Sequence, residues 1–152
     1  MVLIDISNEM IKRARKNTNH LRINNTFFVV GDVEHIPVKT SSTDFTVCLQ
    51  TLIHIPHREK ALNEIKRITK EDGSMIVYLP IYGLKEFIRW SLQFGGIKNF
   101  VNDILRKTGF LKSYSAPSNR REFSSVLTGL KLRAITYFKI GPWDTFVLKK
   151  EK

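Results

Sequence analysis

The sequence predicts an α/β fold with a mostly parallel sheet that ends in an antiparallel strand pair. Short apolar runs alternate with amphipathic stretches over residues 1–80, a pattern typical of strands joined by right-handed helical crossovers. The run at 26–30 is β-branched or aromatic throughout, as expected for a strand covered on both faces. Near the end of the chain, two apolar runs flank the turn dipeptide Gly141-Pro142 and predict the antiparallel pair.

The first half of the chain contains four predicted strands and two predicted helices. The strands span residues 2–4, 26–30, 45–49 and 75–79. Ser7 is placed to cap a helix that runs to about Asn17, because a serine hydroxyl can accept a hydrogen bond from the first turn. A second helix begins at His57, carries one apolar stripe and ends at an Asp72-Gly73 turn. That stripe consists of Ala61, Leu62, Ile65 and Ile68.

The second half is predicted to be helical before its final strand pair. Apolar residues over 97–105 have helical spacing, and this helix stops near Gly109. Further helices are predicted at 84–94 and 121–130, and the two final strands at 132–138 and 145–148. With 152 residues and 42% hydrophobic content, the chain is long enough for a single domain with a substantial core.

Cysteine usage and apolar content indicate where the protein works. The single cysteine, Cys48, lies in an apolar run, which excludes a disulfide framework and indicates a reducing compartment. No apolar run approaches the roughly 20 residues that cross a bilayer, and Asp5 stands where a signal peptide would need a basic residue. We therefore expect a cytoplasmic protein without a transmembrane segment.

The net charge of +11 is concentrated in the second half of the chain. Residues 1–80 hold eleven basic and nine acidic residues, whereas residues 81–152 hold fourteen and five. Between Lys85 and Lys112 the basic side chains interleave with aromatic ones. This pattern favours an anionic partner such as RNA or a membrane surface. The alternative to an anionic partner is an amphipathic helical cover whose lysines are simply solvated.

Four stretches carry a family resemblance: VLIDIS at 2–7, GDVEHIP at 31–37, DFTVCLQTLIHIP at 44–56, and the helix and strand over 57–79. With them the chain resembles the S-adenosylmethionine-dependent methyltransferases of the Rossmann-like class, in particular the methyltransferase type 11 domain. The resemblance implies a sheet of order 3-2-1-4-5-7-6 and S-adenosylmethionine as the cofactor. It also implies a cofactor-binding core over 1–80, a helical substrate cover over 81–130 and the terminal strand pair over 131–152.

The predicted cofactor contacts follow the ends of strands, where ligands bind in open parallel sheets. By resemblance, Asp5 accepts hydrogen bonds from both ribose hydroxyls, with Ile6 beside it. Asp32 accepts from the exocyclic amine of adenine, and the backbone amide of Val33 meets a ring nitrogen. The alternative role for each aspartate is a local turn or cap.

Three residues near the end of the strand over 45–49 complete the predicted site. Leu49 and Gln50 are expected beside the methionine and adenosine parts of the cofactor. His54 falls on a histidine common in the family, which makes it a candidate to orient a substrate or act as a general base. A packed structural histidine is the alternative. His54 and His57 lack neighbouring cysteine or carboxylate ligands, so we predict no metal site.

One family motif has no counterpart in this sequence. No Gly-x-Gly occurs, although the family's glycine turn lets the backbone approach the cofactor. That turn follows the family's first strand, which lies at the centre of the sheet and is also missing here. The resemblance thus implies an N-terminally truncated or incomplete domain, a degenerate domain, or one completed by a partner. Two unpaired strand edges predict self-association or partner binding.

The resemblance implies methyl transfer to an unidentified acceptor on a small molecule, a lipid or RNA. Because the methyl donor is already activated, alignment of the acceptor for in-line attack can suffice for catalysis. The alternative is a degenerate, non-catalytic methyltransferase-like domain that binds a ligand or partner. The absent glycine turn favours this alternative, whereas Asp5 and Asp32 favour the enzyme.

Overall fold

The computed structural model describes residues 1–55, 57–79, 120–140 and 143–151. The order of elements is β1 (Val2–Asp5), α1 (Asn8–His20), β2 (Phe27–Val30), β3 (Thr43–Leu49), η1 (Leu52–His54), α2 (Arg58–Ile68), β4 (Thr69–Leu79), α5 (Arg120–Gly129), β5 (Leu132–Ile140) and β6 (Trp143–Lys150). The predicted helices at 84–94 and 97–105 lie outside the described residues. The predicted α/β class is confirmed.

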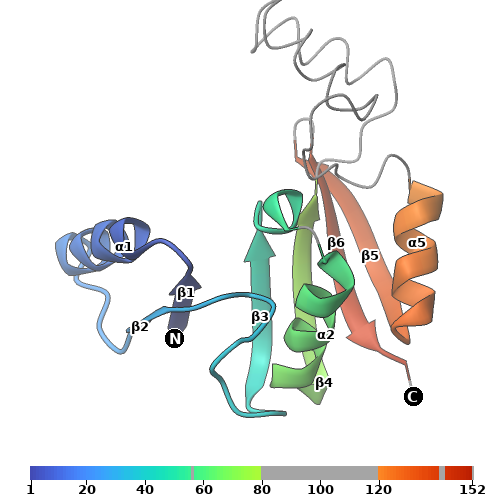
Figure 1. Cartoon of the computed structure of the whole chain (residues 1–152), viewed down its shortest axis with the longest axis horizontal. Helices are drawn as coiled ribbons and strands as arrows, with labels where there is room; N and C mark the ends of the chain where they lie inside the picture. The colour runs from blue at the N-terminus through green and yellow to red at the C-terminus, as the bar shows by residue number, and fades with distance from the viewer. Residues whose placement is uncertain (56, 80–119, 141–142, 152) are drawn as a thin grey trace, which may run out of the picture.

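The strands combine parallel and antiparallel pairing (Figure 1). β1 pairs with β2 in parallel, and a second sheet has the order β3-β4-β6-β5. In that sheet β3 and β4 are parallel, whereas β6 runs antiparallel to both β4 and β5. This arrangement confirms the predicted terminal antiparallel pair and the Rossmann-like class of the sheet.

Strands β1 and β3 each have one unpaired edge within the described part of the chain. There, β1 pairs only with β2 and β3 pairs only with β4, so the strands form two sheets rather than one. Figure 1 shows β1 and β3 pointing the same way, with β1, α1 and β2 to one side of the larger sheet. The unpaired edges that the sequence predicts are therefore present among the described strands.

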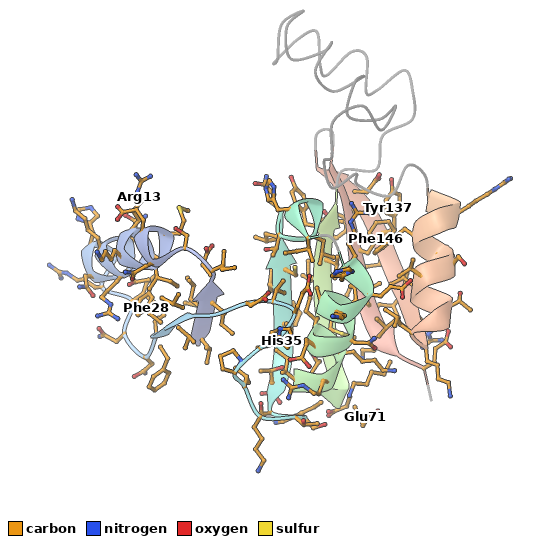
Figure 2. The ribbon with its side chains drawn as sticks, viewed as in Figure 1. Arg13, Phe28, His35, Glu71, Tyr137 and Phe146 are labelled. Carbon is orange, nitrogen blue, oxygen red and sulfur yellow. The ribbon has the colours of Figure 1, made fainter. Side chains whose placement is uncertain are left out.

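Helix α1 is set by a local cap and by packing on β2. The Ser7 hydroxyl accepts a hydrogen bond from the Met10 amide at 3.3 Å, as the sequence predicts. The helix continues to His20, three residues beyond the predicted end. The Arg15 guanidinium lies 5.2 Å from the centre of the Phe28 ring, a cation–π contact that joins α1 to β2. Figure 2 labels Phe28 on this unit.

The core lies between one face of the larger sheet and the helices α2 and α5 (Figure 1). The Phe146 ring of β6 lies 4.8 Å from that of Phe123 in α5 and 5.3 Å from that of Tyr137 in β5. Figure 2 labels Tyr137 and Phe146. The buried members of this core on α2 and β4 include Ala61, Leu62, Ile65, Ile68, Met75 and Val77. On the opposite face of β3, three apolar side chains are exposed: Phe45, Val47 and Leu49.

The end of α2 differs from its prediction. The helix ends at Ile68, and Asp72-Gly73 lies within β4 instead of forming a turn after the helix. The carbonyls of Arg67 and Ile68 accept hydrogen bonds from the amides of Ser41 and Ser42, which belong to the loop before β3. Because these tertiary bonds occupy the last-turn carbonyls, the helix does not continue. No local sequence pattern predicts these hydrogen bonds.

Three threonines join the end of α2 to β3. The Thr43 hydroxyl donates to the Ile68 carbonyl at 3.0 Å, and the fully buried Thr69 hydroxyl donates to the Ile65 carbonyl at 2.7 Å. The Thr46 hydroxyl lies between them, 2.9 Å from that of Thr43 and 2.7 Å from that of Thr69. Thr43 and Thr46 are half-buried, and the shared hydroxyl contacts offset the cost of burying their oxygens.

Gly73→Ala is expected to destabilise the protein by about 1–3 kcal/mol, because the site has no room for a methyl group. A Cβ at Gly73 would lie 2.7 Å from Thr69 Cγ2 and 2.9 Å from the backbone oxygen of Asp44. Backbone atoms cannot move aside as a side-chain end can. Urea unfolding of wild type and variant measures the difference.

Gly129→Ala is the matched control for this experiment. Gly129 ends α5, and a Cβ there would meet no atom within 4 Å. Its replacement should leave stability unchanged or raise it slightly, because alanine favours the helix. If both variants unfold at the wild-type urea concentration, the close packing described at Gly73 is wrong.

Candidate functional site

The structure brings Asp5 and Asp32 to the same end of one strand pair. Asp5 pairs with Val30 at the end of the β1–β2 ladder. The next amide, that of Gly31, donates to the Asp5 carbonyl at 3.0 Å. Asp32 therefore follows directly on a residue that is hydrogen-bonded to Asp5. This is the carboxyl end of two parallel strands, where ligands bind in open α/β sheets.

Asp5 has a local structural role that uses one of its two carboxylate oxygens. Its Oδ1 accepts a hydrogen bond from the Ser7 amide at 2.8 Å, which shapes the turn into α1. Among the described residues, none forms a hydrogen bond or ion pair with Oδ2. A carboxylate has lone pairs on both oxygens, so the turn leaves acceptor capacity for a ligand.

Asp32 is arranged in the same way. Its Oδ1 accepts from the Glu34 amide at 2.9 Å, and its backbone carbonyl accepts from the His35 amide at 3.0 Å. The His35 Nδ1 lies 3.5 Å from Oδ2, and both side chains are solvent-accessible. Figure 2 labels His35. Val33, the next residue, is half-buried against the core. The turn role that the sequence left open is present, and Oδ2 has the exposed His35 ring as its neighbour.

Leu49 and Gln50 lie at the carboxyl end of β3. The Leu49 side chain is 59% exposed. Gln50 adopts a left-handed backbone conformation with φ of 55°, which is uncommon for a residue other than glycine. Such conformations concentrate at binding sites, where surrounding structure holds them. Both residues occupy the predicted location, and their contact with a cofactor stays a prediction.

His54 is exposed at the end of η1, and its backbone amide donates to the Thr51 carbonyl at 3.0 Å. Its ring has no hydrogen-bond partner among the residues that the structure describes. This exposure does not fit the alternative of a packed structural histidine. A substrate-orienting or general-base role for His54 stays a prediction.

Cys48 directly precedes these residues but is unsuited to nucleophilic chemistry. The side chain is buried, and burial raises the pKa of its thiol from 9.0 to about 11. The thiol is therefore protonated at neutral pH, and the thiolate is the reactive form. Cys48 acts as a small apolar residue of the core.

Two functional candidates were missed by the sequence reasoning. Glu64 and Arg67 on α2 form an ion pair with 2.7 Å between Nε and Oε1, and both bind the backbone of the loop that carries Asp32. The available signal was a pair of opposite charges one helical turn apart, beside the apolar stripe. Such spacing more often indicates a solvated surface pair, so it does not single out a loop contact.

The remaining predicted features concern metals, membranes and anionic partners. Among the described residues, no group of histidine, cysteine or acidic side chains is arranged to hold a metal ion. The helices of the described ranges are each too short or too polar to cross a membrane. The basic and aromatic residues between Lys85 and Lys112 lie outside the described residues, so the anionic partner stays a prediction.

Comparison with known proteins identifies related sequences. Residues 1–77 match the family model described as a methyltransferase domain. An uncharacterized protein of Methanocaldococcus jannaschii is 28% identical over 149 residues, which cover 97% of this chain and 52% of that protein. The ubiquinone/menaquinone biosynthesis C-methyltransferase UbiE of Rickettsia akari is 34% identical over 77 residues, which cover 50% of this chain and 31% of that protein. The chain thus spans about half or less of these relatives.

A solved structure shows the same fold. The magnesium protoporphyrin IX methyltransferase of Synechocystis PCC 6803, crystallised with bound SAH, superposes with a TM-score of 0.67. The match covers 99% of this chain and 64% of that protein, at 14% identity. At this identity the likeness concerns the fold alone.

Proposed function

Because this chain belongs to the methyltransferase domain family, we propose that it binds S-adenosylmethionine at the carboxyl ends of β1 and β2 and serves methyl transfer. One observation carries the location. The Gly31 amide donates to the Asp5 carbonyl, which places two carboxylates at adjacent strand ends, each with one oxygen that no turn amide binds. Two anionic acceptors suit a ligand with two ribose hydroxyls and an exocyclic amine.

In this proposal each residue has a distinct role. Asp5 accepts from the ribose hydroxyls through Oδ2 while Oδ1 holds the Ser7 turn. Asp32 accepts from the adenine amine, and the Val33 amide meets a ring nitrogen. Ile6 is 74% exposed beside Asp5 and offers an apolar surface to the cofactor. The cofactor, when bound, supplies a methyl group already activated on a sulfonium, so the chain's task is to orient the acceptor.

Leu49 and Gln50 complete the proposed cofactor site from β3. Their position at the end of a strand in the second sheet suits contact with the part of the ligand that extends beyond β1. The acceptor is a small molecule, a lipid or RNA, and His54 is the candidate to orient it. An RNA or membrane acceptor would also engage the basic residues of the second half of the chain.

A non-catalytic binding domain is the second candidate, and two observations favour it. The sequence has no Gly-x-Gly, and within the described residues no strand lies between β1 and β3. Backbone contacts to the cofactor are therefore fewer than a glycine turn would supply. Binding without transfer would follow if the remaining contacts hold the cofactor but do not align it with an acceptor.

Titration of the isotope-labelled chain with S-adenosylmethionine, followed by NMR, tests the proposal. We expect amide shifts at Asp5, Ile6, Asp32 and Val33 and a dissociation constant weaker than micromolar. Free methionine, which lacks the nucleoside, is the matched control ligand and should leave these amides unshifted. Saturating cofactor without shifts at these residues would refute the location. Micromolar affinity would instead show that the glycine turn is dispensable.

A further inference from the structure

Glu64 and Arg67 hold the loop over 31–42 by its backbone. The Ile36 amide donates to Glu64 Oε2 at 2.8 Å, and Arg67 Nη2 donates to the Ile36 carbonyl at 2.8 Å. Arg67 Nη1 donates to the Val38 carbonyl at 2.9 Å and lies 3.1 Å from the Thr40 hydroxyl. Both polar groups of Ile36 are thus bound by two side chains of α2.

The ion pair itself is fixed by two parallel hydrogen bonds. Arg67 Nε and Nη2 donate to Glu64 Oε1 and Oε2 at 2.7 and 2.8 Å, which is the bidentate geometry of strong arginine–carboxylate pairs. The hydrogen bond from Arg67 holds the pKa of Glu64 below its ordinary value, so Glu64 is ionised at neutral pH. Each side chain is then held in one orientation while it binds the loop.

A second pair of opposite charges, Glu9 and Arg13 on α1, is an exposed surface pair and serves as a comparison. Glu9 and Arg13 lie one turn apart, 3.7 Å between the nearest atoms, with side chains 65% and 70% exposed. The Glu64 and Arg67 side chains are 20% and 32% exposed. Figure 2 shows Arg13 on the outer side of α1, away from the loop over 31–42.

The Glu64–Arg67 pair, which we call the clamp, binds a part of the loop that lies next to Asp32. Ile36 is buried in the core, four residues after Asp32. A Cβ at Gly31 would lie 3.3 Å from Pro37 Cδ, so Pro37 closes against the residue that precedes Asp32. The Asp32 carbonyl also accepts the His35 amide at 3.0 Å. Asp32 and Val33 therefore lie in a short segment fixed at Gly31 by β1 and at Ile36 by α2.

We propose that Glu64 and Arg67 are positioning residues that hold Asp32 and Val33 in the orientation that reads the adenine edge. The inference rests on the proposed function, because it assigns a purpose to the same site. Neither residue needs to touch the cofactor. Loss of the clamp frees the Ile36 end of the segment, and the Asp32 carboxylate and the Val33 amide then lose their fixed relative placement.

The test compares the affinity for S-adenosylhomocysteine with that for S-inosylhomocysteine, in which an oxygen replaces the adenine amine. Wild type should prefer the adenine ligand. Glu64→Gln keeps the size of the side chain but removes its charge and replaces one acceptor oxygen by an NH2 group, so the bidentate pair with Arg67 that orients it toward Ile36 is lost. It should lower the preference about five-fold, as for the loss of one net hydrogen bond. Asp32→Asn defines the preference that remains when the reading carboxylate is lost.

The control is Glu9→Gln, the same change in the exposed pair of α1, which should keep the wild-type preference. Arg67→Lys is the second clamp variant, since lysine keeps the charge but lacks the fork that joins two carbonyls. Hydrogen exchange of the ligand-free chain gives a separate readout. The Ile36 amide should exchange faster in both clamp variants than in wild type. In Glu9→Gln its exchange rate should equal that of wild type.

The outcomes separate this inference from the proposed function. If wild type binds neither ligand, the proposed function fails and the inference fails with it. If wild type prefers adenine and both clamp variants keep that preference, or weaken both ligands equally, the proposed function stands and the positioning role is wrong. Reduced preference in Glu64→Gln and Arg67→Lys with wild-type behaviour in Glu9→Gln supports the inference.

Discussion

Asp5→Asn is expected to weaken binding of S-adenosylhomocysteine about ten-fold or more. A hydrogen bond to a charged group contributes on the order of 1.5 to 3 kcal/mol, and each 1.4 kcal/mol changes affinity ten-fold. Asparagine retains an oxygen that can accept the Ser7 amide, so the turn into α1 is kept. The loss then reports the ribose contact. NMR titration of wild type and variant measures it.

Asp5→Ala separates the two roles of this side chain. It removes the acceptor of the Ser7 amide as well as the ribose contact, so it should weaken binding at least as much and also destabilise the start of α1. Asp44→Asn is the matched control. Asp44 lies near the amino end of β3, its side chain is 85% exposed, and its partner is Lys70 at 2.7 Å. Affinity equal to wild type in Asp5→Asn would contradict the ribose assignment.

The chain is expected to self-associate or bind a partner strand through the unpaired edges of β1 and β3. Backbone N–H and C=O groups along such edges favour pairing with another strand. The apolar side chains Phe45, Val47 and Leu49 are exposed on the same strand β3, which adds apolar surface to the edge. Size-exclusion chromatography with light scattering should give a mass above the 17.6 kDa of one chain.

Two lysine substitutions locate the association. Val47→Lys places a charge on β3 at a residue that is 49% exposed, and it should shift the protein toward the monomer. Ile135→Lys makes the same change on the other outer strand of this sheet, β5, at a residue that is 47% exposed. Ile135 lies at a bulge, which twists an edge away from pairing, so this variant should associate like wild type. A monomeric wild type would mean that the edges are protected.

The elements of this fold were largely predictable because their causes are local. The Ser7 hydroxyl caps α1 from three residues away, and the apolar stripe of Ala61, Leu62, Ile65 and Ile68 is buried as its spacing predicts. The continuous apolar run before Gly31 forms the parallel strand β2. Each of these features depends on residues that are close together in the sequence, where residue pattern and backbone geometry are directly coupled.

The location of the candidate site was also predictable, whereas its internal geometry was not. Asp5 and Asp32 follow strands that are parallel neighbours, and strand order brings their ends together. The left-handed conformation of Gln50 depends on surrounding structure, because glutamine has no local preference for it. In each aspartate a turn amide binds Oδ1, so Oδ2 is the oxygen that keeps acceptor capacity for a ligand.

The sequence by itself determined the α/β class, the strands of the first half, the capped first helix and the two carboxylates at strand ends. Only the tertiary structure decided that α2 ends at Ile68, that the described strands separate into two sheets, and that Glu64 and Arg67 hold the loop of Asp32. The physical reason is common to all three. Each depends on hydrogen bonds made or left unmade between residues about 25 or more positions apart, and the pattern around either partner does not encode the other.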